Sequence, residues 1–340
     1  MKIADTHFVF HAEGDQVKGT GHVARALGLA LDMQKVYSNL YISFYTNSRD
    51  ICVKFMNAWN ISSDIQVLFL SDDQQPPCNW EISSQQHLQS LLKSKKVAKS
   101  EVLITDGKYG WSEEEWTLIK KRFNYVIAID NISSLNMPID ANIYPTAYFK
   151  MPEPNKIPKS KTLFGEDWVW LNGAIDKIQK HPSKTHDFSI FMGGADPTNL
   201  SLKALQDIVF KYQEVKKIIV ITGPLYKYQK TLNVFIKNTK QQVTHMESEN
   251  NYHLELLRAN YTLIAFGLSS MELASLGQAC ILYSHNPEHQ NDMDNYLTVT
   301  EGNTSTSREL WLQGVIPISS NIKARINVGK NIISLVESLS

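Results

Sequence analysis

The chain has 340 residues, of which 43% are hydrophobic and 20% charged, and this is the composition of an ordinary globular protein with about two domains. Its 34 Lys and Arg residues balance 34 Asp and Glu residues, so bulk charge argues against a nucleic-acid binder and against a polybasic membrane anchor. No apolar run approaches the roughly 18 residues that span a bilayer, and the N-terminal residues lack the apolar region of a signal peptide, so we expect a cytoplasmic protein.

Short apolar runs alternate with helical patterns in the first half of the chain. Strands are predicted at residues 8–10, 40–45, 67–70, 102–105 and 125–129, and a helix is predicted at residues 23–36. A further helix is expected to begin after Ser112, because Glu115 stands three residues later in the pattern of a capping box. This alternation predicts a parallel sheet covered by helices.

Four prolines between residues 144 and 161 predict a loop near a domain junction, and the same alternation then resumes. Strands are predicted at residues 188–192, 218–222, 261–265 and 279–283, and helices at residues 200–212, 252–259 and 270–276. The sequence therefore predicts an α/β protein with two doubly wound, Rossmann-like domains in tandem, at residues 1–165 and 166–340. Because open parallel sheets bind ligands beyond the carboxyl ends of their strands, we expect the site in a cleft between the domains.

The loop before the first helix contains the first candidate residues. Gly19 and Gly21 allow a tight turn or a close approach to a ligand, and His22 follows them at the start of the helix. The positive end of the helix dipole favours a neutral imidazole there, which can accept a proton from water or an alcohol. The alternative is a histidine that only bonds to its own loop. NAD is rejected, although Gly19, Gly21 and Ala24 fit G-x-G-x-x-A, because no acidic residue closes the second strand.

Asp106 and Asp130 each follow an apolar strand, where carboxylates either face a ligand or cap a helix. In the second half, Gly193-Gly194 follows one strand and Gly267-Leu268-Ser269-Ser270 follows another. Backbone N–H groups in such loops suit phosphate, and Glu272 could accept both hydroxyls of a ribose. The two loops together predict a site for a diphosphate that carries a sugar, whereas Glu272 could instead be a solvated helix residue.

No metal site is expected. The three cysteines lack the spacing of metal ligands or of a disulfide framework. Asp292-Met293-Asp294 spells the D-x-D of one class of glycosyltransferases, but a solvated helix start is the more ordinary interpretation of these residues.

Four motifs occur in an order that resembles a known family. They are G-x-G-H-x-x-R with L-x-L-A (19–30), G-G-x-D-x-x-N (193–199), G-x-S-S-x-E-x-x-x-x-G (267–277) and N-x-x-x-Q (286–290). Together they resemble the UDP-sugar hydrolases of pseudaminic acid biosynthesis, the PseG type. The resemblance covers residues 8 to 290 approximately, and it implies the two-domain GT-B fold of inverting glycosyltransferases such as MurG.

The resemblance implies release of UDP from a UDP-linked diacetamido trideoxy altrose by water, without a metal or cofactor. His22 would activate the water, and the sugar side would include Gly19, Gly21, Glu13, Asp106, Tyr109 and Asn199. The UDP side would include Gly193, Gly194, Gly267, Ser269, Ser270, Glu272 and Gln290. UDP is a good leaving group, so one base and an anion cradle suffice.

The chain departs from the family pattern at three places in its first half. His11-Ala12-Glu13 replaces Arg-x-Asp, Asp106-Gly107-Lys108-Tyr109 replaces Asp-His-Tyr, and Asp130-Asn131 replaces Asp-Asp. Two alternatives therefore stay open beside the hydrolase. One is an inverting glycosyltransferase in which His22 deprotonates an acceptor hydroxyl, and the other is a non-catalytic protein that binds nucleotide sugars.

Overall fold

The computed structural model describes residues 2–15, 19–58, 66–69, 88–89, 91–93, 98–131, 134, 136–145, 160–172, 175, 178, 180–248, 252–287, 290, 293 and 328–339. The chain divides into two compact units. The first unit comprises residues 1–14, 22–170 and 326–340, and the second unit comprises residues 15–21 and 171–325. The sequence prediction placed residues 166–340 together, whereas here the C-terminal helix groups with the first unit.

A parallel sheet of seven strands forms the first unit, in the order β3-β2-β1-β4-β5-β6-β7. The strands are β1 (Thr6–Ala12), β2 (Tyr41–Thr46), β3 (Gln66–Phe69), β4 (Ser100–Asp106), β5 (Tyr125–Ile129), β6 (Ala141–Tyr144) and β7 (Lys161–Phe164). The first five were predicted, but β6 and β7 were not, because they have four residues each and polar Asn142 and Thr162 interrupt their apolar pattern.

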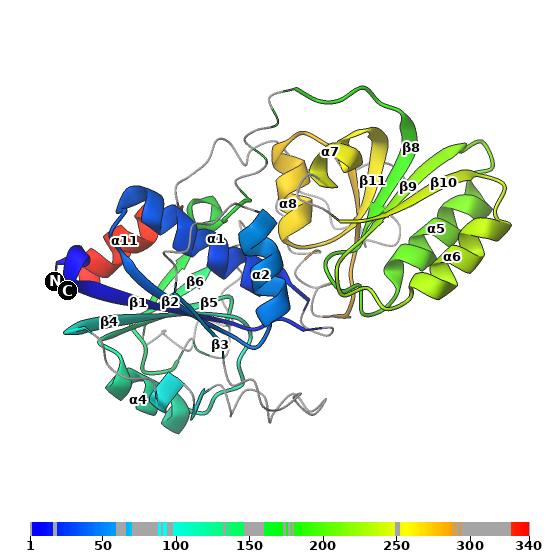
Figure 1. Ribbon diagram of the computed structural model, residues 1–340. Helices are drawn as coiled ribbons and strands as arrows, with labels where there is room; N and C mark the ends of the chain where they lie inside the picture. The colour runs from blue at the N-terminus through cyan, green and yellow to red at the C-terminus, as the bar shows by residue number, and fades with distance from the viewer. Residues whose placement is uncertain are drawn as a thin grey trace. The chain divides into compact units, whose positions relative to one another are not determined.

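Helices cover both faces of this sheet: α1 (Gly21–Val36), α2 (Arg49–Ala58) and α11 (Val328–Leu339) lie on one face and α4 (Glu113–Arg122) on the other (Figure 1). Helix α4 begins with the predicted capping box, in which the Ser112 side chain accepts from the Glu115 N–H and the Glu115 side chain accepts from the Ser112 N–H. Short 3-10 turns at Ile3–Asp5 and Glu166–Trp168 complete the unit.

Helix α11 packs on the first unit although it follows the second unit in the sequence. Its apolar side chains Ile332, Ile333 and Val336 are buried, and its Asn331 side chain donates a 2.9 Å hydrogen bond to the Asp167 carbonyl. Gly329 lies against the backbone of α1 at Asp32, where a Cβ would find no room. The sequence analysis predicted no helix here, although the residues have a clear apolar face.

Gly28 in α1 makes room for the indole of Trp170. A Cβ at Gly28 would overlap this ring, which is buried and held by a 2.9 Å hydrogen bond from its Nε1 to Asp32 Oδ2. Gly28→Ala is therefore expected to lower the free energy of unfolding by about 1–3 kcal/mol, despite the better helix propensity of alanine. Urea unfolding measures this. Gly110→Ala, where a Cβ meets nothing within 4 Å, is the control, and equal stability of both variants would contradict the packing.

The second unit contains a parallel sheet of five strands in the order β10-β9-β8-β11-β12. The strands are β8 (His186–Phe191), β9 (Lys217–Thr222), β10 (Gln242–Glu247), β11 (Ala259–Ala265) and β12 (Cys280–Tyr283). The helices are α5 (Leu200–Lys211), α6 (Gln229–Asn238), α7 (Tyr252–Leu257) and α8 (Leu268–Ser275). The sequence analysis missed α6 and the edge strand β10, whose residues are exposed or half-buried and so form no apolar run.

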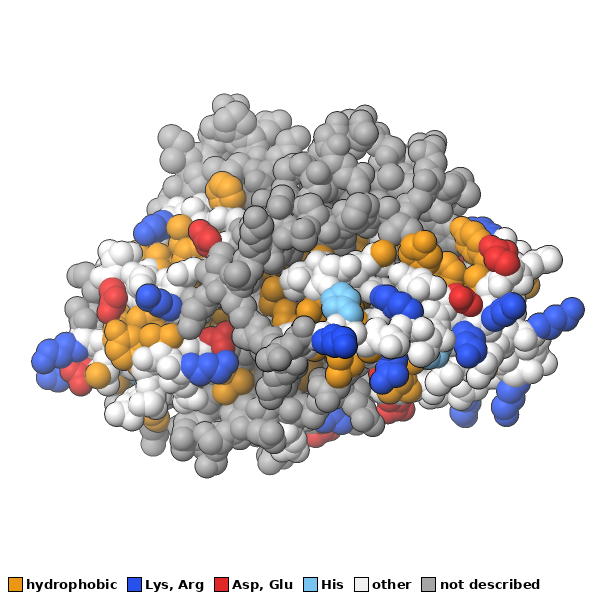
Figure 2. Space-filling model, turned by 90° about the horizontal axis from the view of Figure 1, so that it is seen from above, with side chains coloured by type: hydrophobic (Ala, Val, Ile, Leu, Met, Phe, Trp, Pro, Cys, Tyr) orange, Lys and Arg blue, Asp and Glu red, His pale blue; other side chains and the backbone are white. Residues whose placement is uncertain are grey.

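Side chains of both charge signs are spread over the visible surface, in keeping with the balanced composition (Figure 2). Among the helices that the structure describes, none is long and apolar enough to cross a membrane. Trp111, Trp116 and Trp170 are buried core residues.

Candidate functional site

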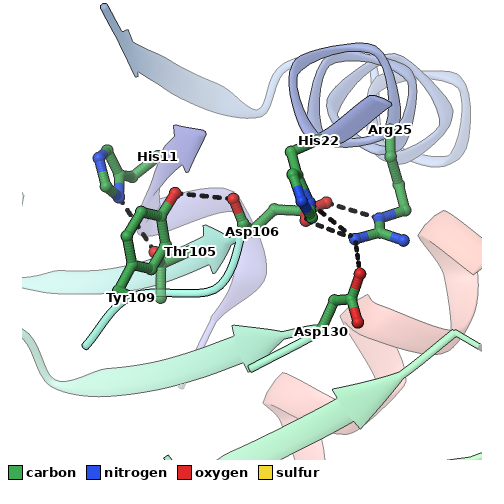
Figure 3. Close-up of polar contacts among 7 residues, drawn as sticks. All are labelled: His11, His22, Arg25, Thr105, Asp106, Tyr109 and Asp130. Atoms are coloured by element: carbon green, nitrogen blue, oxygen red, sulfur yellow. Dashed lines mark hydrogen bonds and ion pairs between the residues drawn. The ribbon is translucent and has the colours of Figure 1, made fainter. Parts of the chain in front are cut away.

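Four charged or titratable side chains meet at the carboxyl edge of the first sheet. We call His22, Arg25, Asp106 and Asp130 the His22 cluster (Figure 3). Asp106 is the last residue of β4, and Asp130 directly follows the neighbouring strand β5. His22 and Arg25 lie three residues apart on the first turns of α1, so both reach the same edge. The sequence analysis singled out His22 and Asp106 separately, and the structure brings them into contact.

Asp106 binds both cluster members of α1. Its Oδ1 lies 2.9 Å from His22 Nδ1 and 2.6 Å from Arg25 Nη2, and its Oδ2 accepts from Arg25 Nε at 2.7 Å. Arg25 Nη2 also donates to Asp130 Oδ2 at 3.0 Å. Arg25 therefore bridges two carboxylates that come from neighbouring strands.

These contacts determine which nitrogen of His22 carries the proton. His22 Nδ1 lies near an acceptor, Asp106 Oδ1, and near a donor, Arg25 Nη2 at 3.2 Å. The two hydrogens of Nη2 already have closer acceptors on Asp106 and Asp130. Nδ1 therefore donates to Asp106, and Nε2 keeps the lone pair of a neutral imidazole. The side chain is 20% exposed, so this lone pair can meet a water molecule.

Each charged side chain in the His22 cluster stabilises the ionised form of its neighbour. Burial by itself would raise the pKa of the Asp106 carboxyl, but the Arg25 guanidinium and the His22 hydrogen bond more than offset it and lower the pKa. Burial opposes the charge on Arg25 too, yet Asp106 and Asp130 raise its pKa above the ordinary value. Asp106 is fully buried and is an anion at neutral pH, as an imidazole orienter must be.

Two of the predicted sugar-side residues, Tyr109 and Glu13, are buried beside His11. Tyr109 is 2% exposed, donates a 2.7 Å hydrogen bond from its hydroxyl to the Asp106 carbonyl, and packs against the rings of both His11 and Trp111. Glu13 is 1% exposed and lies 3.7 Å from His11 Nε2. Tyr109 and Glu13 are thus both buried in this structure, and Tyr109 bonds to the end of β4.

The glycine loop before α1 is described at its two ends only. Gly19 has a φ of 74° and pairs with Asp15 through two backbone hydrogen bonds, and Gly21 is the first residue of α1. The left-handed φ explains the glycine at position 19, because other residues rarely adopt it.

The two predicted glycine loops of the second unit follow adjacent strands, β8 and β11. Gly193 and Gly267 have positive φ values of 86° and 149°. Ser270 is buried, and its hydroxyl bonds to both the N–H and the carbonyl of Gly267. Ser269 Oγ lies 3.0 Å from the Tyr252 hydroxyl. Both loops thus lie at the carboxyl edge of the second sheet. The hydrogen bonds of Ser269 and Ser270 fix the conformation of the loop at Gly267.

Asp196 and Asn199 organise the loop that follows Gly193 and Gly194. The Asp196 carboxylate accepts from the backbone N–H groups of Leu200 and Ser201 at 2.7 and 2.8 Å and so caps α5. Asn199 has a φ of 56°, and its Oδ1 accepts from the Tyr226 hydroxyl at 2.6 Å.

Gln290, also predicted to bind UDP, accepts from Ser284 Oγ at 2.7 Å. Asp292 and Asp294 lie outside the described residues.

Glu272 is buried, at 2% exposure, and is not the solvated helix residue that the sequence left open. Its Oε2 lies 2.7 Å from His253 Nε2 and 3.3 Å from the Tyr252 hydroxyl, and its Oε1 accepts from the Asn172 N–H at 3.0 Å. Burial and the neighbouring Glu272 raise the pKa of Tyr252 well above its ordinary value. Protein donors therefore bond to both oxygens of this buried carboxylate, and its role toward a ribose stays a prediction.

Glu272→Gln is expected to lower the free energy of unfolding by about 1–3 kcal/mol, because an amide nitrogen would face one of these buried donors. Thermal or urea unfolding tests this. Glu255→Gln is the matched control, since the Glu255–Arg258 ion pair is partly exposed and is expected to contribute at most about 1 kcal/mol. Similar losses in the two variants would show that the Glu272 network is not stabilising.

Sequence reasoning missed the residues that hold these groups in place. Arg25 stood in the first motif without a role, and His253 was not singled out. His285 was also missed: its Nε2 donates to the Met192 carbonyl at 3.0 Å, its Nδ1 lies 3.0 Å from Thr198 Oγ1, and burial lowers its pKa. Their partners are distant in sequence, so local pattern gives no signal.

Among the described residues, no three His, Cys, Asp or Glu side chains are grouped as metal ligands.

Comparison with known proteins identifies the class of fold. No family model matches the chain. The uncharacterized protein MJ1062 of Methanocaldococcus jannaschii is 24% identical over 302 residues, which are 84% of this chain, and this chain spans 57% of that protein. MurG of Acinetobacter baumannii is 13% identical with a TM-score of 0.58, over 98% of this chain and 99% of MurG.

The UDP-GlcNAc 2-epimerase of Neisseria meningitidis, solved with UDP-GlcNAc bound, is also 13% identical with a TM-score of 0.58, over 97% of this chain and 100% of the epimerase. Staphylococcus aureus MnaA, solved with UDP, has a TM-score of 0.58 at 11% identity, over 97% of this chain and 96% of MnaA. The two parallel-sheet α/β units and the likeness to MurG and the epimerase over nearly the whole chain give the chain the GT-B fold.

Proposed function

We propose that this protein is an enzyme that releases UDP from a UDP-sugar by hydrolysis, with His22 as the general base. The observation that carries the proposal is the contact between His22 Nδ1 and the buried carboxylate of Asp106. It orients a neutral imidazole whose Nε2 lone pair can take a proton, at the carboxyl edge of a parallel sheet where such folds bind ligands.

The reaction would proceed in one displacement. His22 Nε2 takes a proton from water while the water oxygen attacks the anomeric carbon. The bond from that carbon to the diphosphate oxygen breaks, and the electron pair leaves with UDP. The proton stays on Nε2, and the Asp106 carboxylate stabilises the resulting imidazolium until the proton returns to solvent. The diphosphate is a good leaving group, so no protein acid has to protonate it.

We assign the nucleotide to the second unit. Its two glycine loops follow adjacent strands at the carboxyl edge of the sheet, where backbone N–H groups suit phosphate. The similar solved structures support a UDP-sugar as the ligand, because the Neisseria epimerase and MnaA are described with UDP-GlcNAc and UDP bound. The resemblance of the four sequence motifs to the PseG type implies a diacetamido trideoxy hexose of the pseudaminic acid type as the sugar, and we include it in the proposal.

A glycosyltransferase is the second candidate, since MurG has the same fold and His22 could take the proton of an acceptor hydroxyl instead of water. The three departures from the hydrolase motifs lie in the first unit, which holds the base, and this keeps the transferase in consideration.

The deciding experiment follows the UDP-linked diacetamido altrose by ¹H and ³¹P NMR with the purified chain. Free sugar and UDP in the absence of any acceptor support the hydrolase. UDP release that requires an added acceptor supports the transferase. UDP binding without turnover under both conditions would leave a nucleotide-sugar-binding protein, and no binding of UDP would overturn all three.

A further inference from the structure

We propose that Asp130 is a positioning residue that keeps the proton of His22 on Nδ1 by occupying the free hydrogen of Arg25. The inference rests on the proposed function, because it concerns the residue assigned as the base. It assigns to Asp130 a role that is distinct from contact with substrate.

The geometry leaves Arg25 Nη2 with a choice of acceptors. Nη2 has two hydrogens and three acceptor atoms within reach: Asp106 Oδ1 at 2.6 Å, Asp130 Oδ2 at 3.0 Å and His22 Nδ1 at 3.2 Å. One hydrogen stays with Asp106, which is also bound by Arg25 Nε. The second goes to Asp130. If Asp130 could not accept it, the nearest remaining acceptor would be His22 Nδ1.

A hydrogen bond from Arg25 to His22 Nδ1 would reverse the imidazole. Nδ1 can accept only when it carries no proton, so the proton would move to Nε2. The lone pair that takes a proton from water would then point at Arg25 instead. A histidine in the wrong tautomer cannot act as a base at the atom that faces the reaction. Asp130 therefore contributes to catalysis through Arg25, without touching the imidazole.

The backbone conformation of Asp130 supports a functional role for this residue. Its φ is 58°, in the left-handed region that non-glycine residues rarely adopt, and this conformation directs the carboxylate toward Arg25 (Figure 3). Such conformations cost free energy and are concentrated at functional sites. The side chain is 33% exposed, so burial of Asp130 does not explain the strained backbone.

A second cluster in the same sheet has the same His, carboxylate and Arg groups, but its histidine is fully bonded and buried. His7 Nδ1 lies 3.0 Å from Glu101 Oε1, and Arg122 pairs with the other oxygen of Glu101. There, however, His7 Nε2 lies 2.9 Å from Ser43 Oγ, so both ring nitrogens are engaged and the side chain is 5% exposed. For His22, no hydrogen bond joins Nε2 to any residue in the described part of the chain. The two clusters share their chemistry, and only the His22 cluster offers a base.

Two substitutions separate the hydrogen bond from the charge and from the backbone strain. Asp130→Gly removes the acceptor and adopts the positive φ without strain. Asp130→Asn removes the charge but keeps an oxygen that can accept from Arg25, and asparagine tolerates the left-handed region. We expect Asp130→Gly to lower kcat for UDP release at least about tenfold with little change in KM, whereas Asp130→Asn stays within about threefold of the wild type.

The tautomer itself is read by ¹⁵N NMR of the histidine ring nitrogens, which needs no turnover. In the wild type and in Asp130→Asn, His22 should show a protonated Nδ1 at neutral pH. In Asp130→Gly the signal should move toward a protonated Nε2, and His7 should stay unchanged as an internal reference. An unaltered His22 tautomer in Asp130→Gly would overturn the inference, as would equal losses of kcat in the glycine and asparagine variants.

The two proposals fail in different ways. If the wild type releases no UDP, the proposed function fails, and the NMR comparison still decides whether Asp130 sets the tautomer. If the wild type is active and Asp130→Gly is equally active with the same tautomer, Asp130 has no positioning role and the hydrolase stands.

Discussion

His22→Gln is expected to lower the rate of UDP release at least about 100-fold, because the glutamine amide has no lone pair on nitrogen that can take a proton from water. Glutamine is close in length and its amide can still donate to Asp106, so the stability of the cluster should change by less than about 1 kcal/mol. The affinity for UDP, measured by calorimetry, should be unchanged, since the proposed nucleotide loops belong to the second unit.

The pattern of these three measurements tests the mechanism. Loss of turnover with intact stability and intact UDP binding is the expected result. A variant that keeps more than a tenth of the wild-type rate would remove His22 from the role of base. Parallel loss of stability and activity would instead indicate a structural histidine, and the Asp106 variant below provides the comparison for that case.

Asp106→Asn should have the largest effect on stability of any substitution in the cluster. The buried carboxylate accepts two hydrogen bonds from Arg25 and one from His22, and asparagine would turn an N–H group toward one of these donors. Removing one partner of a buried ion pair costs about 3–5 kcal/mol, although Asp130 still compensates part of the Arg25 charge. Activity should fall as well, because the imidazole loses the group that orients it.

The difference in unfolding free energy between the wild type and Asp106→Asn should depend on pH, because the pKa of Asp106 is shifted in the folded protein. The pKa of Asp106 is lower in the folded protein than the value of about 3.9 expected in the unfolded chain. Its ionised form therefore stabilises the fold above that value, and this stabilisation is lost as the pH falls through the lower folded-state pKa. Urea unfolding from pH 7 down to pH 3 should show the wild type losing stability at the acid end while Asp106→Asn loses less. A constant difference between the two proteins would contradict an ionised Asp106.

Much of the fold could be predicted because its central strands are continuous apolar runs. Residues 125–129 and 218–222 match the observed strands within one residue, since central parallel strands are buried on both faces. The prediction missed three strands that lack such a run. Edge strands β7 and β10 are partly exposed, and β6, next to the edge, has only four residues, so polar residues hide the apolar pattern on which the prediction depends.

The candidate site was predictable as a set of positions but not as a set of contacts. His22 and Asp106 follow from the rule that ligands bind at the carboxyl ends of parallel strands. Arg25 bonds to Asp106 and Asp130, which are 81 and 105 residues away, and no local pattern encodes such a pairing. Glu13 and Tyr109 are polar residues that follow strands β1 and β4, yet the structure buries both: Tyr109 packs against His11 and Trp111, and Glu13 lies beside His11.

The return of α11 to the first unit has a consequence for the order of folding during synthesis. Residues 328–339 leave the ribosome after the whole second unit, yet they cover the face of α1 around Asp32 and bond to Asp167. Until then the nascent first unit exposes the apolar surface that Ile332, Ile333 and Val336 later bury. The second unit can therefore complete its own sheet first, and the N-terminal half, although translated earlier, reaches its final packing last.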